Sequence, residues 1–474
     1  MNILFCASEC VPFAASGGLG DVAGSLPARL NSKGADVRVI LPLYARTKEK
    51  YIDEMKFVDS FYVSLSWRNQ YCGLFTAERN GVTYYFIDNE YYFSREKMYG
   101  YFDDGERFAF FSKAILETIL HLDFKPDVIH TNDWQTALVC TYLNIYYRHI
   151  AKLRNVKTVF TIHNIRYQGQ YGLDMAADVL GIPDSWMSHI EWNGDVNFMK
   201  SAIEDADIVS TVSPTYAREI LGPFHGHGLD GILKYKQYKL WGILNGIDYE
   251  SYDPKTDGRI ARNFHAGAFV RGKGACKEDL RDYFELEKDS SPVISMVTRL
   301  VDHKGVDIVR RCADALVDMG YQMVVLGSGD WDYENFFRDL ALRHPGRVGV
   351  EIGFIPSLAR RIYAGSDMFL MPSLSEPCGL SQMIAMRYGT IPIVRRTGGL
   401  RDSVSDSLGG KGVGFVFSEY SADDLYKACA RAYEGYGDRE GWRILTKRAM
   451  KQDDSWSRSA ERYMEMYEEC MKQW

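Results

Sequence analysis

The chain has 474 residues, of which 46% are hydrophobic and 25% are charged, and its formal net charge is −7. This length predicts about two to four domains, and the hydrophobic fraction excludes a largely disordered chain. The acidic balance argues against a dedicated nucleic-acid-binding protein, and the lack of any apolar run of about 18 residues argues against a membrane-spanning helix. The start, MNILFCASEC, has no basic segment before its apolar stretch, so it predicts a strand rather than a signal peptide. We therefore expect a cytoplasmic protein, or a mature form whose leader was removed, without membrane or nucleic-acid partners.

The nine cysteines are scattered along the chain and none forms a CxxC pair. This pattern predicts that most of the thiols are reduced and buried, as in a cytosolic enzyme. The ten histidines form no HExxH motif, and His225 and His227 in the segment FHGHG are a better match to a polar loop than to a metal site. The sequence leaves the oligomeric state open, a homo-oligomer included.

The first half of the chain alternates short apolar runs with helical periodicity. A glycine-rich loop at residues 15–20 follows the first apolar run, and a helix to about Ser32 ends before Gly34. This order is typical of a parallel sheet covered by helices on both faces. The expected strands lie at residues 3–7, 37–41, 128–130, 159–163 and 208–212.

The same pattern begins again in the second half. After a predicted strand at residues 293–298, apolar residues recur at helical spacing up to Gly320, which ends that helix. The periodic positions are Val306, Val309, Ala313 and Leu316. The further strands are predicted at residues 323–326, 348–352, 368–371 and 391–394.

These two series predict an α/β protein with two doubly wound domains, at residues 1–240 and 241–454. Residues 241–288 show no strong periodicity and carry the segment GIDYESYDPKTDGR, as an interdomain connection would. A last helix is expected over about residues 455–474, and packing back on the first domain is one candidate for its place. Ligands of open α/β sheets bind beyond the carboxyl ends of strands, so polar residues directly after strands have most weight.

Two segments of the first domain carry candidate site residues. The loop before the first helix contains Gly17 and Gly18, which let backbone N–H groups approach an anion, and Asp21 follows them. A tight turn with Asp21 as a helix cap is the alternative interpretation. His163 ends a predicted strand. A single histidine is usually structural, but this position at a strand end supports a functional role about as well as a structural one.

The second domain carries cations and a carboxylate after its strands. Arg299 and Lys304 follow the first strand, and fixed cations there suit a diphosphate without a metal. Glu376 follows the strand MFLMPS, and a helix start at residues 379–381 would stabilise a phosphate through its dipole. The segment RRTGGL at residues 395–400 offers a second turn suited to an anion. Solvated surface charges and a helix-capping carboxylate are the structural alternatives.

Motifs along nearly the whole chain resemble the family of bacterial glycogen synthases and plant starch synthases. The matching segments include SGGLGDVAGSLP, RFAFFSKA, DVIHTNDWQTAL, TIHNIRYQGQYG, TVSPTYAREI, ILNGIDY, TRLVDHKGVD and EPCGLSQMIAMRYGTIPIVRRTGGL, in the family's order and spacing. The resemblance implies a GT-B fold, in which two Rossmann-like domains face each other across a cleft. It also implies a retaining glucosyltransferase that elongates an α-1,4-glucan such as glycogen from ADP-glucose, or UDP-glucose in some members, without a cofactor or metal.

The same resemblance implies roles for individual residues. It gives catalytic roles to Glu376, Asp133 and His163, with His163 supporting the positive charge that develops at the anomeric carbon. The resemblance places Asp21 on the acceptor side of the site. The residues that it assigns to donor binding are Gly17, Gly18, Asn245, Arg299, Lys304, Phe354, Gly379, Leu380 and Ser381. Glycosyl transfer builds charge on the leaving diphosphate, which needs cations on one side and acceptors on the sugar side. Because these groups fall in both domains, we expect domain closure to complete the site.

Several positions depart from the family's pattern, among them Leu374 and Ser375, where the family has an arginine and a phenylalanine before the glutamate. Ala15 replaces a lysine that normally helps to hold the donor phosphates, and losing one charge-assisted hydrogen bond costs about 1.5–3 kcal/mol. Asn132 stands where a histidine is common, and Phe354 keeps the ring of a common tyrosine but not its hydroxyl. These changes leave the nucleotide preference open between ADP-glucose and UDP-glucose.

Other functions remain as alternatives. The scaffold also suits transfer of another sugar, and Ala15 motivates a non-catalytic glucan-binding homologue. The joint presence of Glu376, Arg299, Lys304 and His163 argues against decay to such a homologue. A phosphorylase is disfavoured, since it needs a pyridoxal-phosphate lysine and usually a much longer chain.

Overall fold

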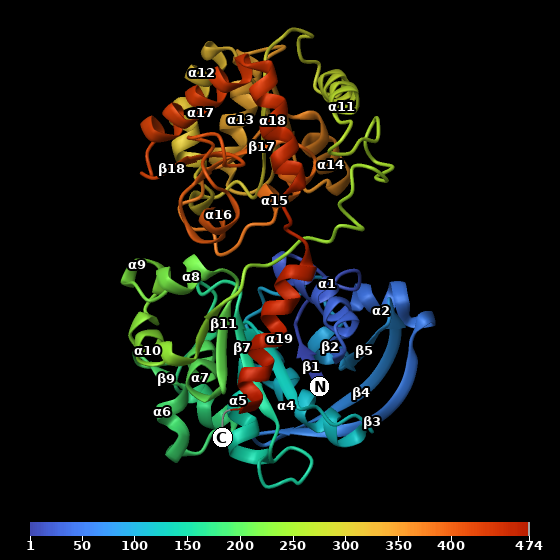
Figure 1. Ribbon diagram of the computed structural model, residues 1–474. Coiled ribbons are helices and arrows are strands. Elements are labelled where there is room, and N and C mark those ends of the chain that lie inside the picture. The colour runs from blue at the N-terminus through green and yellow to red at the C-terminus, as the bar shows by residue number, and fades with distance from the viewer. Residues whose placement is uncertain (473–474) are drawn as a thin grey trace. The chain divides into compact units, whose positions relative to one another are not determined.

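The computed structural model describes residues 1–472, which form two compact units. Unit 1 combines Met1–Ile243 with the C-terminal segment that begins at Trp456, and unit 2 comprises Leu244–Ser455. Each unit has its own sheet, and the two are described separately below (Figure 1).

Unit 1 is built on a nine-stranded sheet. Its strands, in spatial order, are β12 (Leu240–Gly242), β11 (Ile208–Thr211), β7 (Lys157–Ile162), β6 (Val128–Asn132), β1 (Asn2–Cys6), β2 (Asp36–Pro42), β5 (Val82–Asp88), β4 (Arg68–Arg79) and β3 (Lys56–Leu65). From β12 to β5 all neighbours are parallel. The strands β1 and β6 are buried along almost their whole length, as expected for a parallel sheet with helices on both faces.

The parallel pairing that the sequence predicted does not extend to one edge of unit 1. The strands β4 and β3 pair antiparallel with β5 and with each other, and they curve outward beyond β5 in Figure 1. In β3, only Val63 and Leu65 are buried, so the strand lacks the continuous apolar run that marked the central strands. A solvent-facing antiparallel edge is therefore invisible to a search for buried strands.

Helices cover both faces of this sheet. They are α1 (Gly18–Ser32), α2 (Ala45–Tyr51), α3 (Glu90–Phe93), α4 (Asp104–His121), α5 (Trp134–Tyr142), α6 (Met187–Ile190), α7 (Phe198–Asp205), α8 (Pro214–Glu219), α9 (Pro223–Gly226) and α10 (Asp230–Tyr235). A small antiparallel sheet adds β8 (Gln170–Tyr171), β10 (Asp195–Asn197) and β9 (Glu191–Trp192). Short 3-10 or π turns lie at Ile52–Glu54, Leu143–Tyr147, Ala176–Leu180, Asp184–Trp186 and Gln237–Lys239.

The last helix, α19 (Trp456–Lys472), packs in unit 1 although unit 2 precedes it in the chain. Its buried residues, among them Trp456, Tyr463 and Tyr467, join the core cluster that also contains α1 and β1 residues. The hydroxyl of Tyr467 lies 2.6 Å from Nδ1 of the buried His130 in β6. In Figure 1 the red α19 accordingly lies beside α1 and β7.

Unit 2 has a six-stranded parallel sheet. Its spatial order is β15 (Val348–Ile352), β14 (Gln322–Gly327), β13 (Val293–Val297), β16 (Met368–Met371), β17 (Ile391–Arg395) and β18 (Phe415–Phe417). The helices are α11 (Val270–Tyr283), α12 (Val306–Met319), α13 (Trp331–Arg343), α14 (Pro356–Gly365), α15 (Ser381–Arg387), α16 (Gly398–Ser403), α17 (Ala422–Gly437) and α18 (Arg439–Lys451), with a 3-10 turn at Asp302–Lys304. The predicted helix that ends at Gly320 is confirmed: it is α12, and Gly320 has the left-handed φ of +114° that suits a glycine cap.

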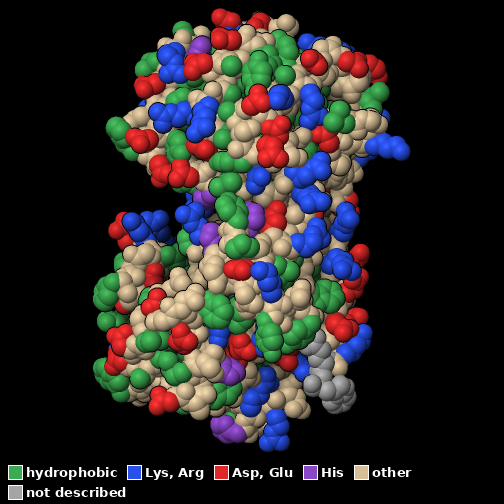
Figure 2. Space-filling model, turned by 90° about the vertical axis from the view of Figure 1, so that its left-hand side faces the viewer, with side chains coloured by type: hydrophobic (Ala, Val, Ile, Leu, Met, Phe, Trp, Pro, Cys, Tyr) green, Lys and Arg blue, Asp and Glu red, His purple; other side chains and the backbone are tan. Residues whose placement is uncertain are grey.

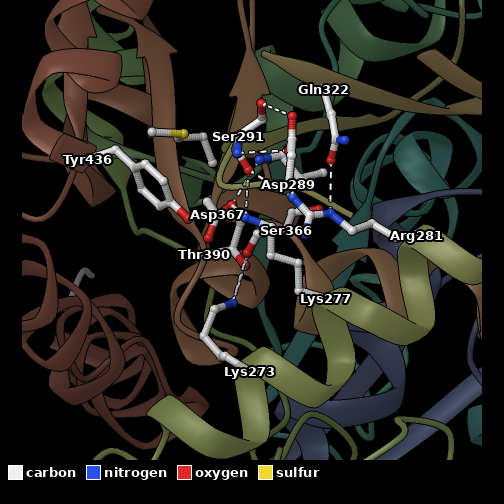
Figure 3. A network of polar contacts seen from close by, with 12 residues as sticks. Lys273, Lys277, Arg281, Asp289, Ser291, Gln322, Ser366, Asp367, Thr390 and Tyr436 are labelled. Carbon is white, nitrogen blue, oxygen red and sulfur yellow. Dashed lines mark hydrogen bonds and ion pairs between the residues drawn. The ribbon is translucent and has the colours of Figure 1, made fainter. Parts of the chain in front are cut away.

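Residues 241–288 are not the irregular connection that we expected, because they contain α11. Charged side chains one helical turn apart, Lys273, Lys277 and Arg281, anchor this helix (Figure 3). The Nζ of Lys277 donates to Oδ2 of Asp367 at 2.7 Å, and the Nζ of Lys273 lies 2.9–3.1 Å from four oxygens, those of Ala364, Ser366, Tyr388 and Thr390. The helix is thus fixed by these cations together with the buried Cys276 and Leu280, and it has too few apolar positions for a clear periodicity.

All nine cysteines are buried and unbridged, as the sequence predicted. Within residues 1–472 no helix is long and apolar enough to cross a bilayer. On the face drawn in Figure 2, basic and acidic side chains are intermingled over the surface of each unit rather than gathered into one basic stripe.

Candidate active site

The strand order of unit 1 reverses between β1 and β6. The chain proceeds from β1 to β2 on one side and returns later to β6 on the other, which creates a crevice at the carboxyl ends of these strands. Glu9 lies just beyond β1 and Asp133 just beyond β6. The two carboxyl groups are close enough for the charge of Glu9 to contribute to the raised pKa of Asp133. This crevice is therefore the place in unit 1 to examine for chemistry.

Asp133 has an unusual backbone conformation at this point. Its φ of +56° and ψ of 179° form a combination that is costly for any residue with a side chain. Its Oδ1 accepts hydrogen bonds from the N–H groups of His163 at 2.7 Å and Asn164 at 3.4 Å. Burial, with a smaller contribution from Glu9, nevertheless raises the pKa of Asp133 to about 7. Strain and a perturbed carboxyl in one residue are typical of a functional site.

His163 follows β7, the strand next to β6. Its Nε2 lies 2.9 Å from Oδ1 of Asn132, and burial lowers the pKa of His163 to about 3. The imidazole is therefore neutral at pH 7. In the sequence, Asn132 stood out only as a departure from a pattern; its position at the end of a buried strand, directly before Asp133, was the available signal.

The glycine-rich loop before α1 is held by Glu9, a residue that was not singled out from the sequence. The carboxylate accepts hydrogen bonds from the N–H of Ser16 at 2.6 Å, the hydroxyl of Ser16 at 2.8 Å and the N–H of Gly17 at 3.1 Å. The hydroxyl of Tyr99 donates to it as well, at 2.9 Å. In this structure the amides of Ser16 and Gly17 thus bind a carboxyl group of the chain itself, and the predicted ligand anion stays a prediction.

Gly17 and Gly18 are not explained by the packing of the chain. A Cβ built at either position would meet no atom within 4 Å, and Gly17 has an extended φ of −160° that other residues adopt. Both glycines are exposed, and no other part of the chain fills the space beside them. Asp21 is half-buried and lies in the first turn of α1. The N-cap of this helix is Gly17, so the interpretation of Asp21 as the helix cap is wrong.

In unit 2 the strand order reverses between β13 and β16, and the predicted residues follow these two strands. Lys304 Nζ and Glu376 Oε2 form an ion pair of 2.6 Å, and the hydroxyl of Ser373 donates to the same oxygen at 2.9 Å. Glu376 is only 6% exposed. The structure thus joins two residues that lie 72 positions apart in the sequence.

Three further predicted donor residues of unit 2 leave groups free for a ligand. Arg299 is exposed just beyond β13, and its guanidinium has no ion-pair or hydrogen-bond partner among residues 1–472. Asn245 is 6% exposed, yet its Oδ1 is buried without a hydrogen-bond partner. Because a buried polar atom in a native protein is almost always satisfied, this oxygen marks a position for a ligand or a water. Phe354, after β15, is 89% exposed.

The loop that carries Glu376 is braced by the segment 395–400. A Cβ at Gly398 would lie 1.9 Å from the carbonyl oxygen of Glu376, and one at Gly399 would lie 2.1 Å from that of Cys378. The guanidinium of Arg395 donates to the carbonyl oxygens of Ser373 and Leu374 at 2.9 and 2.6 Å. The glycines of this segment therefore serve close backbone packing against the loop of Glu376, and the second anion turn stays a prediction.

The predicted helix start behind Glu376 is present. Gly379 has a left-handed φ of +71°, Leu380 is the N-cap, and α15 begins at Ser381. The first-turn N–H groups of a helix have no partner within the helix, so they are available to an anion. Among residues 1–472 no group of three or more His, Cys, Asp or Glu side chains could hold a metal ion.

Comparisons with known proteins give a consistent result. Residues 2–235 match the family model described as the starch synthase catalytic domain, and residues 280–448 match that of glycosyl transferases group 1. The chain is 48% identical to a glycogen synthase of Bacillus cereus, covering 100% of both chains. It is 45% identical to that of Anoxybacillus flavithermus, covering 99% of this chain and 98% of the relative.

Solved structures resemble it as well. The catalytic domain of starch synthase IV from Arabidopsis thaliana, bound to ADP and acarbose, superposes with a TM-score of 0.91 at 34% identity, covering 99% of each chain. Sucrose-phosphate synthase from Thermosynechococcus elongatus, at 17% identity and a TM-score of 0.61, shares the fold. The architecture is the GT-B fold.

Proposed function

The chain belongs to the glycogen and starch synthase family of glycosyltransferases, and on this premise we propose that it transfers glucose from ADP-glucose to the non-reducing end of an α-1,4-glucan. The proposal includes retention of configuration at the anomeric carbon. It is supported by full-length similarity to bacterial glycogen synthases and by a solved relative that was bound to ADP and acarbose.

The observation that carries the proposal is the arrangement around Glu376 in unit 2. A buried carboxylate can accept hydrogen bonds from sugar hydroxyls, and its partner Lys304 and the exposed Arg299 supply positive charge after the same strands. Charge that builds on a leaving diphosphate is stabilised by cations fixed in advance. The exposed ring of Phe354 suits stacking on a nucleotide base, and the orphaned Oδ1 of Asn245 suits a sugar hydroxyl.

The residues of unit 1 provide the groups that such a transfer needs near the sugar. Asp133 and the neutral His163 lie at the ends of adjacent strands, and Gly17 and Gly18 leave open space at the start of α1. We assign Asp133 and His163 to the reacting glucose, Gly17 and Gly18 to the donor, and Asp21 to the acceptor side. The proposal requires residues of both units, so a variant in either unit should stop the transfer.

The proposal assigns neutralisation of the diphosphate to Arg299, Lys304 and the first turn of α15, with no cofactor. We also propose that the enzyme works in the cytoplasm. The nine unbridged cysteines support this, because thiols stay reduced in that compartment.

The test is incorporation of labelled glucose into glycogen from ADP-glucose and UDP-glucose in parallel, with and without EDTA. We expect transfer from ADP-glucose that EDTA does not reduce and that both Glu376→Gln and His163→Ala lower by at least about 100-fold. Transfer from UDP-glucose alone would show that the donor is UDP-glucose and not ADP-glucose. Folded protein that transfers glucose from neither donor would contradict the proposal. It would favour the non-catalytic glucan-binding homologue that Ala15, in place of the family's lysine, suggests.

A further inference from the structure

We propose that Asn132 is a positioning residue that holds His163 in the tautomer with its proton on Nε2, so that the lone pair of Nδ1 accepts a hydrogen bond from a hydroxyl of the bound sugar. The inference rests on the proposed function for the identity of the ligand. The tautomer itself follows from the contacts of the chain and can be measured without any transfer reaction.

The orientation of the Asn132 side chain is fixed by what lies on each side of it. Its Nδ2 lies 3.0 Å from the carbonyl oxygen of Cys6 and 3.4 Å from that of His130. Carbonyl oxygens only accept hydrogen bonds, so the amino end of the amide must face them. The amide oxygen, Oδ1, therefore faces the other way, toward Nε2 of His163 at 2.9 Å.

An amide oxygen cannot donate, so the nitrogen that faces it must carry the proton. Burial lowers the pKa of His163 to about 3, so the ring is neutral and has one N–H group only. That group is Nε2–H, and Nδ1 is left with a lone pair. No hydrogen bond or ion pair to Nδ1 of His163 is present among residues 1–472.

The rest of the strand end makes this arrangement rigid. Asn132 is fully buried, its N–H donates to the hydroxyl of Thr136 at 2.6 Å, and that hydroxyl donates to the Asn132 carbonyl at 2.9 Å. The N–H of His163 is held by Asp133. Backbone and ring of His163 are thus fixed from two consecutive residues of the neighbouring strand end.

This geometry gives His163 a definite chemical role. A neutral imidazole with a free Nδ1 is an acceptor and not a proton donor toward the sugar. A site built to accept a hydrogen bond from a hydroxyl rejects ligands that lack it, because the acceptor is then left unpaired. Asn132, which touches no substrate in this account, sets that acceptor through the ring.

The direct test is the tautomer of His163 in the wild-type chain. Long-range proton–nitrogen NMR spectra of protein labelled with 15N-histidine distinguish Nε2–H, Nδ1–H and doubly protonated rings, and the spectrum of His163→Gln assigns the signals. We expect the Nε2–H pattern. A wild-type spectrum with the proton on Nδ1, or on both nitrogens at pH 7, would overturn the proposal, whether or not the protein transfers glucose.

Kinetics test the role of Asn132 through a double-mutant cycle. We expect Asn132→Leu to lower kcat about 10- to 100-fold with the donor KM within about threefold of wild type, and to cost almost nothing further in a His163→Ala background. Effects of the two substitutions that multiply would show that Asn132 does not act through His163.

A matched control is Asn197→Leu. Asn197 is equally buried in unit 1, and its amide bonds Gln168 and the N–H of Lys200 instead of His163. It should match Asn132→Leu in lost stability while leaving the His163 spectrum and kcat near wild type. Should Asn132→Leu lower kcat no more than Asn197→Leu does, the role of Asn132 would be structural only.

Discussion

The ion pair between Lys304 and Glu376 allows a quantitative prediction from asymmetric substitution. Lys304→Met keeps the side-chain stem but removes the charge, which leaves the carboxylate of Glu376, whose side chain is 8% exposed, with the Ser373 hydroxyl as its hydrogen-bond donor. Removing one member of a fully buried pair costs about 3–5 kcal/mol. Lys304 is 17% exposed, so water can partly replace it, and we expect a loss of about 2–3 kcal/mol.

The reverse substitution should be far milder. Glu376→Gln keeps an oxygen that accepts from both Lys304 and Ser373, so we expect a cost of about 1 kcal/mol. In the double variant Lys304→Met/Glu376→Gln no charge is left unpaired, and we expect most of the loss caused by Lys304→Met to be recovered. All three variants should lose glucosyl transfer, since each removes a proposed donor contact.

The assay is hydrogen exchange by mass spectrometry, read from the slowest peptides of β13 and β16 so that it reports unit 2 alone. Lys427→Met serves as the control, because Lys427 pairs with Asp423 on the surface of α17 at side-chain exposures of 66% and 74%. A Lys304→Met chain within about 0.5 kcal/mol of wild type, or a double variant as unstable as Lys304→Met, would refute the reasoning.

Substitutions at three other positions give further tests. Asp133→Asn should raise the free energy of unfolding by about 1–3 kcal/mol at about pH 8, but not at about pH 4. The pKa of Asp133 in the folded chain, about 7, lies above its ordinary value of 3.8. The contribution of this group to stability is therefore full below about pH 4 and is lost as the pH rises through 7. Urea unfolding at both pH values checks this, and an unchanged or lower value at pH 8 would count against burial as the cause. Ala15→Lys should lower the donor KM about 10-fold by restoring a cation for the diphosphate; an unchanged or raised KM in steady-state kinetics would indicate that the new lysine pairs with Glu9 instead. Phe354→Leu should raise the donor KM about 5- to 50-fold without altering thermal stability, because the ring is exposed. Phe354→Tyr keeps a ring, so its donor KM should stay within about threefold of wild type. Equal donor KM values for the wild type and both variants would exclude stacking of Phe354 on the base.

The elements that the sequence predicted well are those with a strong local signal. The strands at residues 348–352 and 368–371 are present with the predicted bounds as β15 and β16, and the helix ending at Gly320 is α12. Predictions failed where that signal is weak: β3 and β4 are solvent-facing antiparallel strands, and α11 is anchored by Lys273 and Lys277 instead of an apolar stripe. Neither has the buried periodicity on which the predictions depend.

The candidate site follows the same division. Residues that stand directly after predicted strands, such as Arg299 and Glu376, could be selected from the sequence because the carboxyl ends of parallel strands carry the ligand in this fold class. Glu9 and Asn132 could not be given their roles in the same way. Each is a common polar residue next to a buried strand, and its function depends on a partner elsewhere in the chain: the amides of the glycine loop for Glu9, and the ring of His163 for Asn132.

The sequence by itself determined the α/β class, the burial of the cysteines and the family, because hydrophobic periodicity and motif spacing are properties of neighbouring residues. Only the tertiary structure decided which strand ends lie side by side. That order joins Lys304 to Glu376 across 72 positions and Asn132 to His163 across 31. It also sets the protonation of Asp133 and His163, since a pKa depends on burial and on charges that the fold brings near, and no local pattern of residues encodes either.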